Sequence, residues 1–137
     1  MHLELYQAET TQVAKEQSAA LDEARVKLLS GVSLSRLEEN GVLHAYQVLI
    51  ENAIGKAKQL LKAKKEPVPI SAYDVFVSLV RVNIISTESL VDWNAVIGLR
   101  NRIVHEYMNI DINRILELVR DQRHQFVTDF LLTPIEQ

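Results

Sequence analysis

Glycine and proline are scarce in this chain, and their scarcity limits the possible folds more than any other feature. The 137 residues include four glycines and three prolines, and two of the prolines fall in the short segment EPVPI at residues 66–70. Strand-and-turn proteins need these residues at short intervals, whereas helix interiors avoid them. The long uninterrupted stretches therefore predict an all-α protein.

The spacing of apolar residues predicts four or five helices. In the second long stretch, an apolar stripe recurs every three to four residues, as on one face of a helix, and neighbouring apolar positions widen it. This stripe consists of Val42, Tyr46, Leu49, Ala53, Ala57 and Leu60. We expect helices over about residues 3–30, 33–65, 71–81, 87–105 and 111–130.

Residues that favour helix ends stand at several of these boundaries. Gly31 can end the first helix. Ser33 or Ser35 can cap the second, and Ser35 fits better because Glu38 follows three residues later, as in a capping box. Ser71 can start the third helix.

The length of the chain indicates one domain, residues 1–137, folded as an up-and-down helical bundle. At 1.5 Å per residue the first two helices would reach ~40 to 50 Å. Because a compact monomer does not need helices of that length, we expect part of them to pack on a partner chain.

Composition narrows the possible functions. Net charge is −3, so nucleic acid would have to bind a local patch. There is no cysteine, which excludes disulfides and thiolate metal sites. The N-terminus does not resemble a signal peptide, and no apolar run is long enough to span a membrane. We expect a soluble cytoplasmic protein.

Several kinds of chemistry find no support in the sequence. None of the four histidines has another four residues away, so we expect no metal site. No phosphate-binding glycine-rich loop or Gly-x-Ser-x-Gly motif occurs, and we expect no cofactor. Trp93 has the spacing of a core residue. The run Lys56, Lys58, Lys62, Lys64 and Lys65 is either a solvated helix end or a phosphate contact.

The stretch GLRNRIVHEYMNID, residues 98–111, concentrates polar groups at the end of the fourth expected helix. Arg100 and Tyr107, seven residues apart, would point the same way, and Asn101 and His105, four apart, would share an adjacent face. These side chains could form a site. Alternatively, they could satisfy the fraying helix end, with Arg100 paired to an acidic residue nearby, Glu106 or Asp111.

The segment from about Glu38 to Asp111 resembles the HEPN superfamily, and within it the HepT branch of toxin–antitoxin nucleases. The signature of that branch, Arg-x4-His-x-Tyr, is met by Arg100, His105 and Tyr107. The upstream segments HAYQVLIENAIGKAKQLL and SAYDVFVSLVRVNII are similar to the second and third helices of the family.

This resemblance implies the toxin of a type II toxin–antitoxin system. It implies a homodimer whose two motifs share one cleft, metal-independent RNA cleavage, and an antitoxin of the minimal nucleotidyltransferase (MNT) type. His105 would be general base or acid, and Arg100 would hold the scissile phosphate. Asn101 and Tyr107 would support substrate binding, and Tyr107 would be the residue that the antitoxin AMPylates.

Two other readings remain open at this point. The chain could be a non-catalytic HEPN subunit that binds a nucleotidyltransferase or a nucleotide. It could also be a helical interaction protein whose polar helix end is incidental. Arg102, on another face, is expected to form a salt bridge or contact the RNA backbone, and His44 and His124 are expected to be structural.

Overall fold

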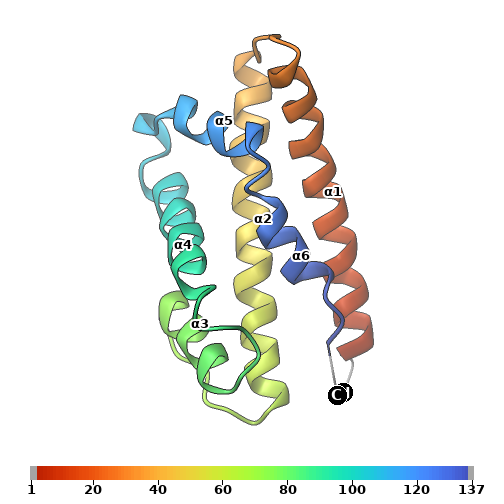
Figure 1. Ribbon diagram of the computed structural model, residues 1–137, viewed down its shortest axis with the longest axis vertical. Coiled ribbons are helices and arrows are strands. Elements are labelled where there is room, and N and C mark those ends of the chain that lie inside the picture. The colour runs from red at the N-terminus through yellow and green to blue at the C-terminus, as the bar shows by residue number, and fades with distance from the viewer. Residues whose placement is uncertain (1–2, 136–137) are drawn as a thin grey trace.

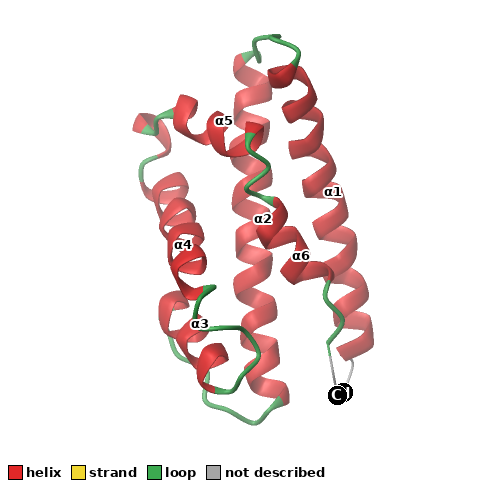
Figure 2. Ribbon diagram, in the orientation of Figure 1, coloured by secondary structure: helices red, strands yellow, loops and turns green. Residues whose placement is uncertain are grey.

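The computed structural model describes residues 3–135, and within that range all regular structure is helical (Figures 1 and 2). The all-α prediction is therefore confirmed. The elements are α1 (Leu3–Leu29), α2 (Arg36–Ala63), α3 (Ala72–Arg81), α4 (Leu90–His105), the 3₁₀ helix η1 (Tyr107–Asn109), α5 (Ile112–Arg120) and α6 (Gln125–Leu132).

The helices form an up-and-down bundle built around α2. The long helices α1 and α2 lie side by side along the longest axis of the molecule, with α3 and α4 along the other side of α2 (Figure 1). α6 packs against both α1 and α2, and α5 packs against α1 (Figure 1). The end of α4 lies beside the segment of α2 from Asn40 to Glu51.

The predicted helix ends at α1, α2 and α3 are confirmed. Gly31 follows α1 with φ +78°, a conformation that costs glycine least. Ser35 accepts a hydrogen bond from the backbone N–H of Glu38, and the Glu38 side chain accepts one from the backbone N–H of Ser35. Both bonds of the capping box are thus present, and Ser71 caps α3 in the simpler way.

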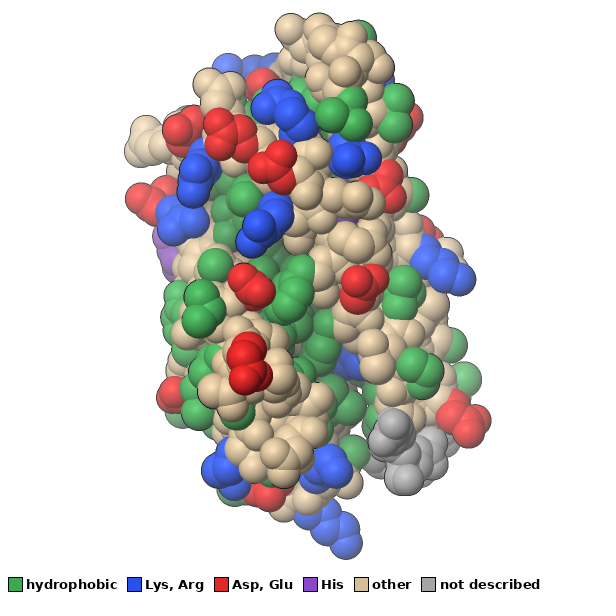
Figure 3. All heavy atoms as spheres, in the orientation of Figure 1, with side chains coloured by type: hydrophobic (Ala, Val, Ile, Leu, Met, Phe, Trp, Pro, Cys, Tyr) green, Lys and Arg blue, Asp and Glu red, His purple; other side chains and the backbone are tan. Residues whose placement is uncertain are grey.

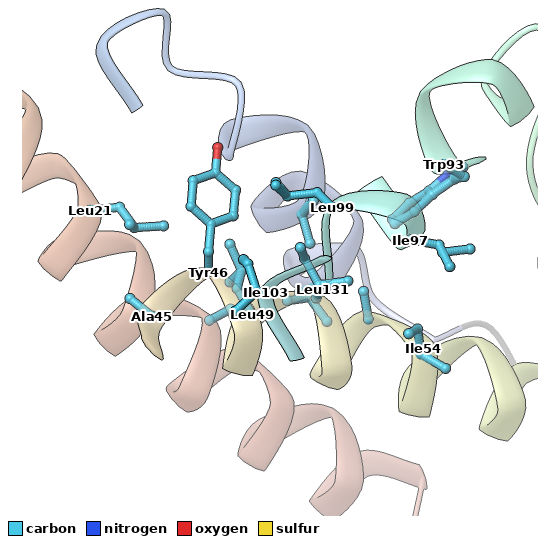
Figure 4. Packing of buried hydrophobic residues seen from close by; sticks show 14 of the residues in the cluster. Leu21, Ala45, Tyr46, Leu49, Ile54, Trp93, Ile97, Leu99, Ile103 and Leu131 are labelled. Atoms are coloured by element: carbon cyan, nitrogen blue, oxygen red, sulfur yellow. The ribbon is translucent and has the colours of Figure 1, made fainter. Parts of the chain in front are cut away.

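An aromatic cluster closes the bundle where α3, α4 and α6 meet. Trp93 is 2% exposed and stacks on Phe76 with ring centroids 4.3 Å apart. Phe126 and Phe130 of α6 also pack against Trp93. Trp93 is therefore a core residue, as predicted, and it belongs to the buried cluster that α2 carries along its length (Figure 4).

The last expected helix is in fact two. Between α5 and α6 the chain turns at residues 121–124, where Gln122 adopts φ +58°. The apolar spacing continues through this turn, and the turn contains neither glycine nor proline, so nothing in the pattern marked it. As a result, six α-helices stand where four or five were expected. The fourth helix also begins at Leu90, three residues later than predicted.

No helix within residues 3–135 has the length and apolar character needed to cross a membrane.

Candidate functional site

The polar motif lies at the junction between α4 and η1. Arg100 and Asn101 are partly buried in the last two turns of α4, and His105 is the exposed final residue of that helix. Tyr107 opens η1 and is 44% exposed. Ile103, fully buried among these residues, anchors the end of the helix to the core and so fixes the position of its polar side chains.

Arg100 is held by two hydrogen bonds. Its Nη2 donates to Oε2 of Glu51 on α2 at 3.2 Å, and its Nη1 donates to Oδ1 of Asn101 at 3.0 Å. The alternative partners considered from the sequence, Glu106 and Asp111, are wrong. Because each terminal nitrogen of a guanidinium carries two hydrogens, both Nη1 and Nη2 keep one further N–H to donate. A fixed guanidinium with remaining donors is suited to binding a phosphate.

Tyr107 also contacts α2, nearer the start of that helix. Its hydroxyl donates to Oδ1 of Asn40 at 3.0 Å. Since α4 ends at His105, the seven-residue helical spacing between Arg100 and Tyr107 does not extend along a continuous helix. Both side chains nevertheless reach α2, so the segment of α2 from Asn40 to Glu51 forms a second wall of the site.

Two of these contact residues were missed by reasoning from the sequence. Glu51 and Asn40 lie 49 and 67 positions from their partners in the chain. The only indication in the sequence was that Asn40 and Glu51 are eleven residues apart. This spacing is close to three full helical turns and places both on one face of α2. Asn101, which the family resemblance implies as a support for substrate binding, accepts the Arg100 hydrogen bond with its side-chain carbonyl oxygen and keeps its amide N–H groups to donate.

The remaining histidines differ in their surroundings. His124 is fully buried, and its Nε2 lies 2.8 Å from Oδ1 of Asp22, so it joins the α5–α6 turn to α1. This agrees with the structural role predicted for it. His44 is exposed on α2, on the side that carries Asn40 and Glu51.

The lysine run is not a uniform basic surface. Lys56 is 1% exposed, and its ammonium group donates to the backbone carbonyls of Phe130, Leu131 and Thr133 at the end of α6. Lys56 is thus neither solvated nor able to reach a phosphate, contrary to both readings of the run. Burial lowers its pKa to about 8.

A cavity of about 770 Å³ lies at the opposite end of the bundle, beside the end of α2 and the segment that follows α3. Its lining includes Leu60, Val82, Ile85 and Phe130. None of the motif residues lines it. The exposed His105 and Tyr107 place the polar site at the surface, away from this cavity.

Comparison with known proteins identifies the family to which this chain belongs. The model of the family described as ribonuclease HepT-like matches residues 14–130. The chain therefore belongs to the HepT-like family, as the resemblance in its motif indicated. No curated protein matches the chain.

Two solved structures share the fold. One is a crystal structure of a toxin–antitoxin with AMP-PNP, with a TM-score of 0.75 and 16% identity over 92% of this chain and 97% of that one. The other is a tri-AMPylated HEPN toxin from Shewanella oneidensis in complex with an MNT antitoxin, with a TM-score of 0.75 and 17% identity over 92% of this chain and 96% of that one. At these identities the similarity shows the fold, which is that of a HEPN toxin.

Proposed function

We propose that this protein is the toxin of a toxin–antitoxin pair and that it cleaves RNA at the end of α4. The observation that carries the proposal is the fixed Arg100 guanidinium, held by Glu51 and Asn101 with N–H groups to spare, in the same helix end as the exposed His105. Membership of the ribonuclease HepT-like family supports it.

The chemistry needs few groups because RNA carries its own nucleophile. A base removes the proton of the 2′-hydroxyl, the 2′-oxygen attacks the adjacent phosphorus, and the bond from phosphorus to the 5′-oxygen breaks as that oxygen takes a proton. Histidine can accept or donate a proton near neutral pH, so His105 can serve in either role. Arg100 stabilises the charge that builds on the phosphate oxygens. We therefore expect cleavage without a metal ion and no cleavage of DNA.

The site is proposed to be completed by a second copy of the chain. In a two-fold dimer the same surface of each protomer meets its counterpart, so two copies of Arg100 and His105 would line one cleft. Such a cleft would present paired positive charge on a protein whose overall charge is −3.

The test of this function is RNA cleavage by the purified protein in EDTA, with tRNA and mRNA as substrates. We expect wild type to cut RNA and His105→Ala to lose at least a hundredfold in rate, in the range that acid–base groups contribute. Cleavage that persists in His105→Ala would remove the proposed role of His105. If wild type cuts no RNA but binds a nucleotidyltransferase, the chain is a non-catalytic HEPN subunit.

The partner proposed for this toxin is an MNT-type nucleotidyltransferase, which transfers AMP to Tyr107. The MNT complex of the Shewanella oneidensis toxin supports this proposal. Tyr107 is partly exposed, and its hydroxyl donates a hydrogen bond to Asn40. In the transfer, its oxygen would bond to the α-phosphorus of ATP, pyrophosphate would leave, and the hydroxyl proton would pass to a base. The added phosphate would repel RNA from the site.

Intact mass measures this modification. After incubation with the antitoxin and ATP, the mass of wild type should rise by whole AMP units. Tyr107→Phe should lack the unit placed on Tyr107. Equal gains in the two proteins would exclude Tyr107 as the acceptor.

A further inference from the structure

Four polar side chains line the face of α2 that contacts the motif. They are Asn40, His44, Gln47 and Glu51, and we call them the polar face of α2. At 100° per residue they fall within an arc of about 60°. Both ends of this face are tied to the motif, because Asn40 accepts the Tyr107 hydrogen bond and Glu51 accepts one from Arg100.

His44 lies between these two contacts. Because α2 and α4 run antiparallel, the chain passes from Arg100, opposite Glu51, to Tyr107, opposite Asn40. His44 is one helical turn from Asn40, about 6 Å along the axis, and about 10 Å from Glu51. Along the axes of the two antiparallel helices, His44 is therefore at the height of the last turn of α4, where His105 lies. Both imidazoles are exposed.

The proposed reaction requires two proton transfers of opposite sense. One group must be neutral to take the 2′-hydroxyl proton, and another must be protonated to supply the 5′-oxygen. Within one protomer the motif supplies one histidine, so the second group is either the partner's His105 or another residue beside the motif. The other residues of the polar face of α2 are less suited to be the second proton-transfer group. Asn40 and Gln47 do not titrate, and Glu51 is engaged by Arg100.

We propose that His44 is the second proton-transfer residue of this site and divides the acid and base roles with His105. This inference rests on the proposed ribonuclease function. In one turnover, one imidazole accepts the 2′-hydroxyl proton as the 2′-oxygen bonds to phosphorus. The other imidazole, in its protonated form, gives its proton to the 5′-oxygen as the phosphorus–oxygen bond breaks. The products are a 2′,3′-cyclic phosphate and a 5′-hydroxyl, and both histidines return to their starting states by proton exchange with water.

A substrate with sulfur in place of the 5′-bridging oxygen separates the two roles. A thiolate leaves without needing a proton, so a variant that lacks the general acid recovers its rate on this substrate, whereas a variant that lacks the base does not. The comparison uses wild type, His44→Gln, His105→Gln and the control Lys15→Gln. Lys15 is an exposed residue of α1 and lies outside the polar face of α2. Thermal unfolding checks that each variant is folded.

On ordinary RNA, we expect His44→Gln and His105→Gln each to lose about a hundredfold or more in rate, and Lys15→Gln to stay within about twofold of wild type. On the sulfur substrate, one of the two histidine variants should return to within about tenfold of wild type, and that variant identifies the acid. The inference is overturned if His44→Gln cuts ordinary RNA at nearly the wild-type rate, or if the sulfur substrate rescues neither variant or both. Wild type that cuts no RNA would overturn the proposed function as well, so the two failures are distinguishable.

Discussion

The contact between Glu51 and Arg100 fixes the position of the guanidinium and offsets part of its charge before substrate binds. Glu51 holds Arg100 in place but also offsets its charge, and the two side chains are 40% and 29% exposed. In Glu51→Ala, the guanidinium is freer and more positive. We therefore expect KM for RNA to fall, while kcat falls by roughly tenfold, which corresponds to a barrier about 1.4 kcal/mol higher from the bound complex.

Steady-state cleavage kinetics measure this split between KM and kcat. Glu117→Ala is the matched control, because Glu117 also pairs with an arginine, Arg114, but on the exposed surface of α5. The control should leave both constants unchanged. A rise in KM with unchanged kcat in Glu51→Ala would mean that Glu51 contributes to RNA binding and not to the positioning of Arg100.

Lys56 gives the stability of the protein a dependence on pH. Its pKa is lowered to about 8 by burial, from 10.5, so between these values the unfolded chain binds a proton that the folded chain does not. Stability therefore rises with pH across that window, and the cost of burying the charge is fully present below pH 8. Urea unfolding from pH 7 to 10.5 should show wild type gaining stability relative to Lys56→Met. A constant difference would contradict the shifted pKa.

The sequence allowed the motif residues to be predicted, but not what holds them. Arg100, Asn101, His105 and Tyr107 lie within eight residues, so local spacing brought them to one helix end. Glu51 lies in another helix, and pairing it with Arg100 required knowing that α2 and α4 pack antiparallel. His44 lies on the same face of α2 as Asn40 and Glu51, and the prediction from the sequence did not place it there for the same reason: its neighbours are set by packing, not by adjacent residues.

At the scale of helices, capping signals predicted boundaries better than apolar spacing did. The Ser35 and Glu38 box is an interaction within four residues, so it is visible in the sequence and forms as expected. The break between α5 and α6 instead coincides with a contact between residues distant in the sequence, in which buried His124 reaches Asp22 of α1. Apolar residues continue with helical spacing on both sides of that break, and this continuity predicted one helix.

The α5–α6 turn can be tested at Gln122. Its φ of +58° is unfavourable for residues with a side chain, and most so for β-branched ones. We expect Gln122→Gly to raise the free energy of unfolding by up to about 1 kcal/mol and Gln122→Val to lower it by about 1–2 kcal/mol. Urea denaturation of the two variants measures the difference. If Gln122→Val is as stable as Gln122→Gly, the turn does not hold this conformation in solution.

At the scale of the whole molecule, the bundle leaves the motif on an open surface. α1 and α2 supply the long frame, and α6 packs on both (Figure 1). Acidic and basic side chains are interspersed on the surface around the end of α4 and α5 (Figure 3), and His105 is exposed there. Exposed apolar side chains surround this helix end: Val104 is 39% and Met108 is 89% exposed. An apolar margin beside a polar site is suited to burial against a second protomer.

The dimer prediction has two parts, mass and shared activity. Light scattering should give twice the chain mass of 15.6 kDa.

Mixed dimers, with one wild-type protomer and one carrying Arg100→Ala, then test whether the cleft is shared. If each protomer cleaves RNA alone, the mixed dimer keeps half of the wild-type rate. A cleft that needs both guanidiniums on the RNA backbone leaves well below half, and this is the result we expect. A value of half would place a complete site within one chain, with Arg100, His105 and His44 sufficient for cleavage, and the second copy would then stabilise the fold rather than join in the chemistry.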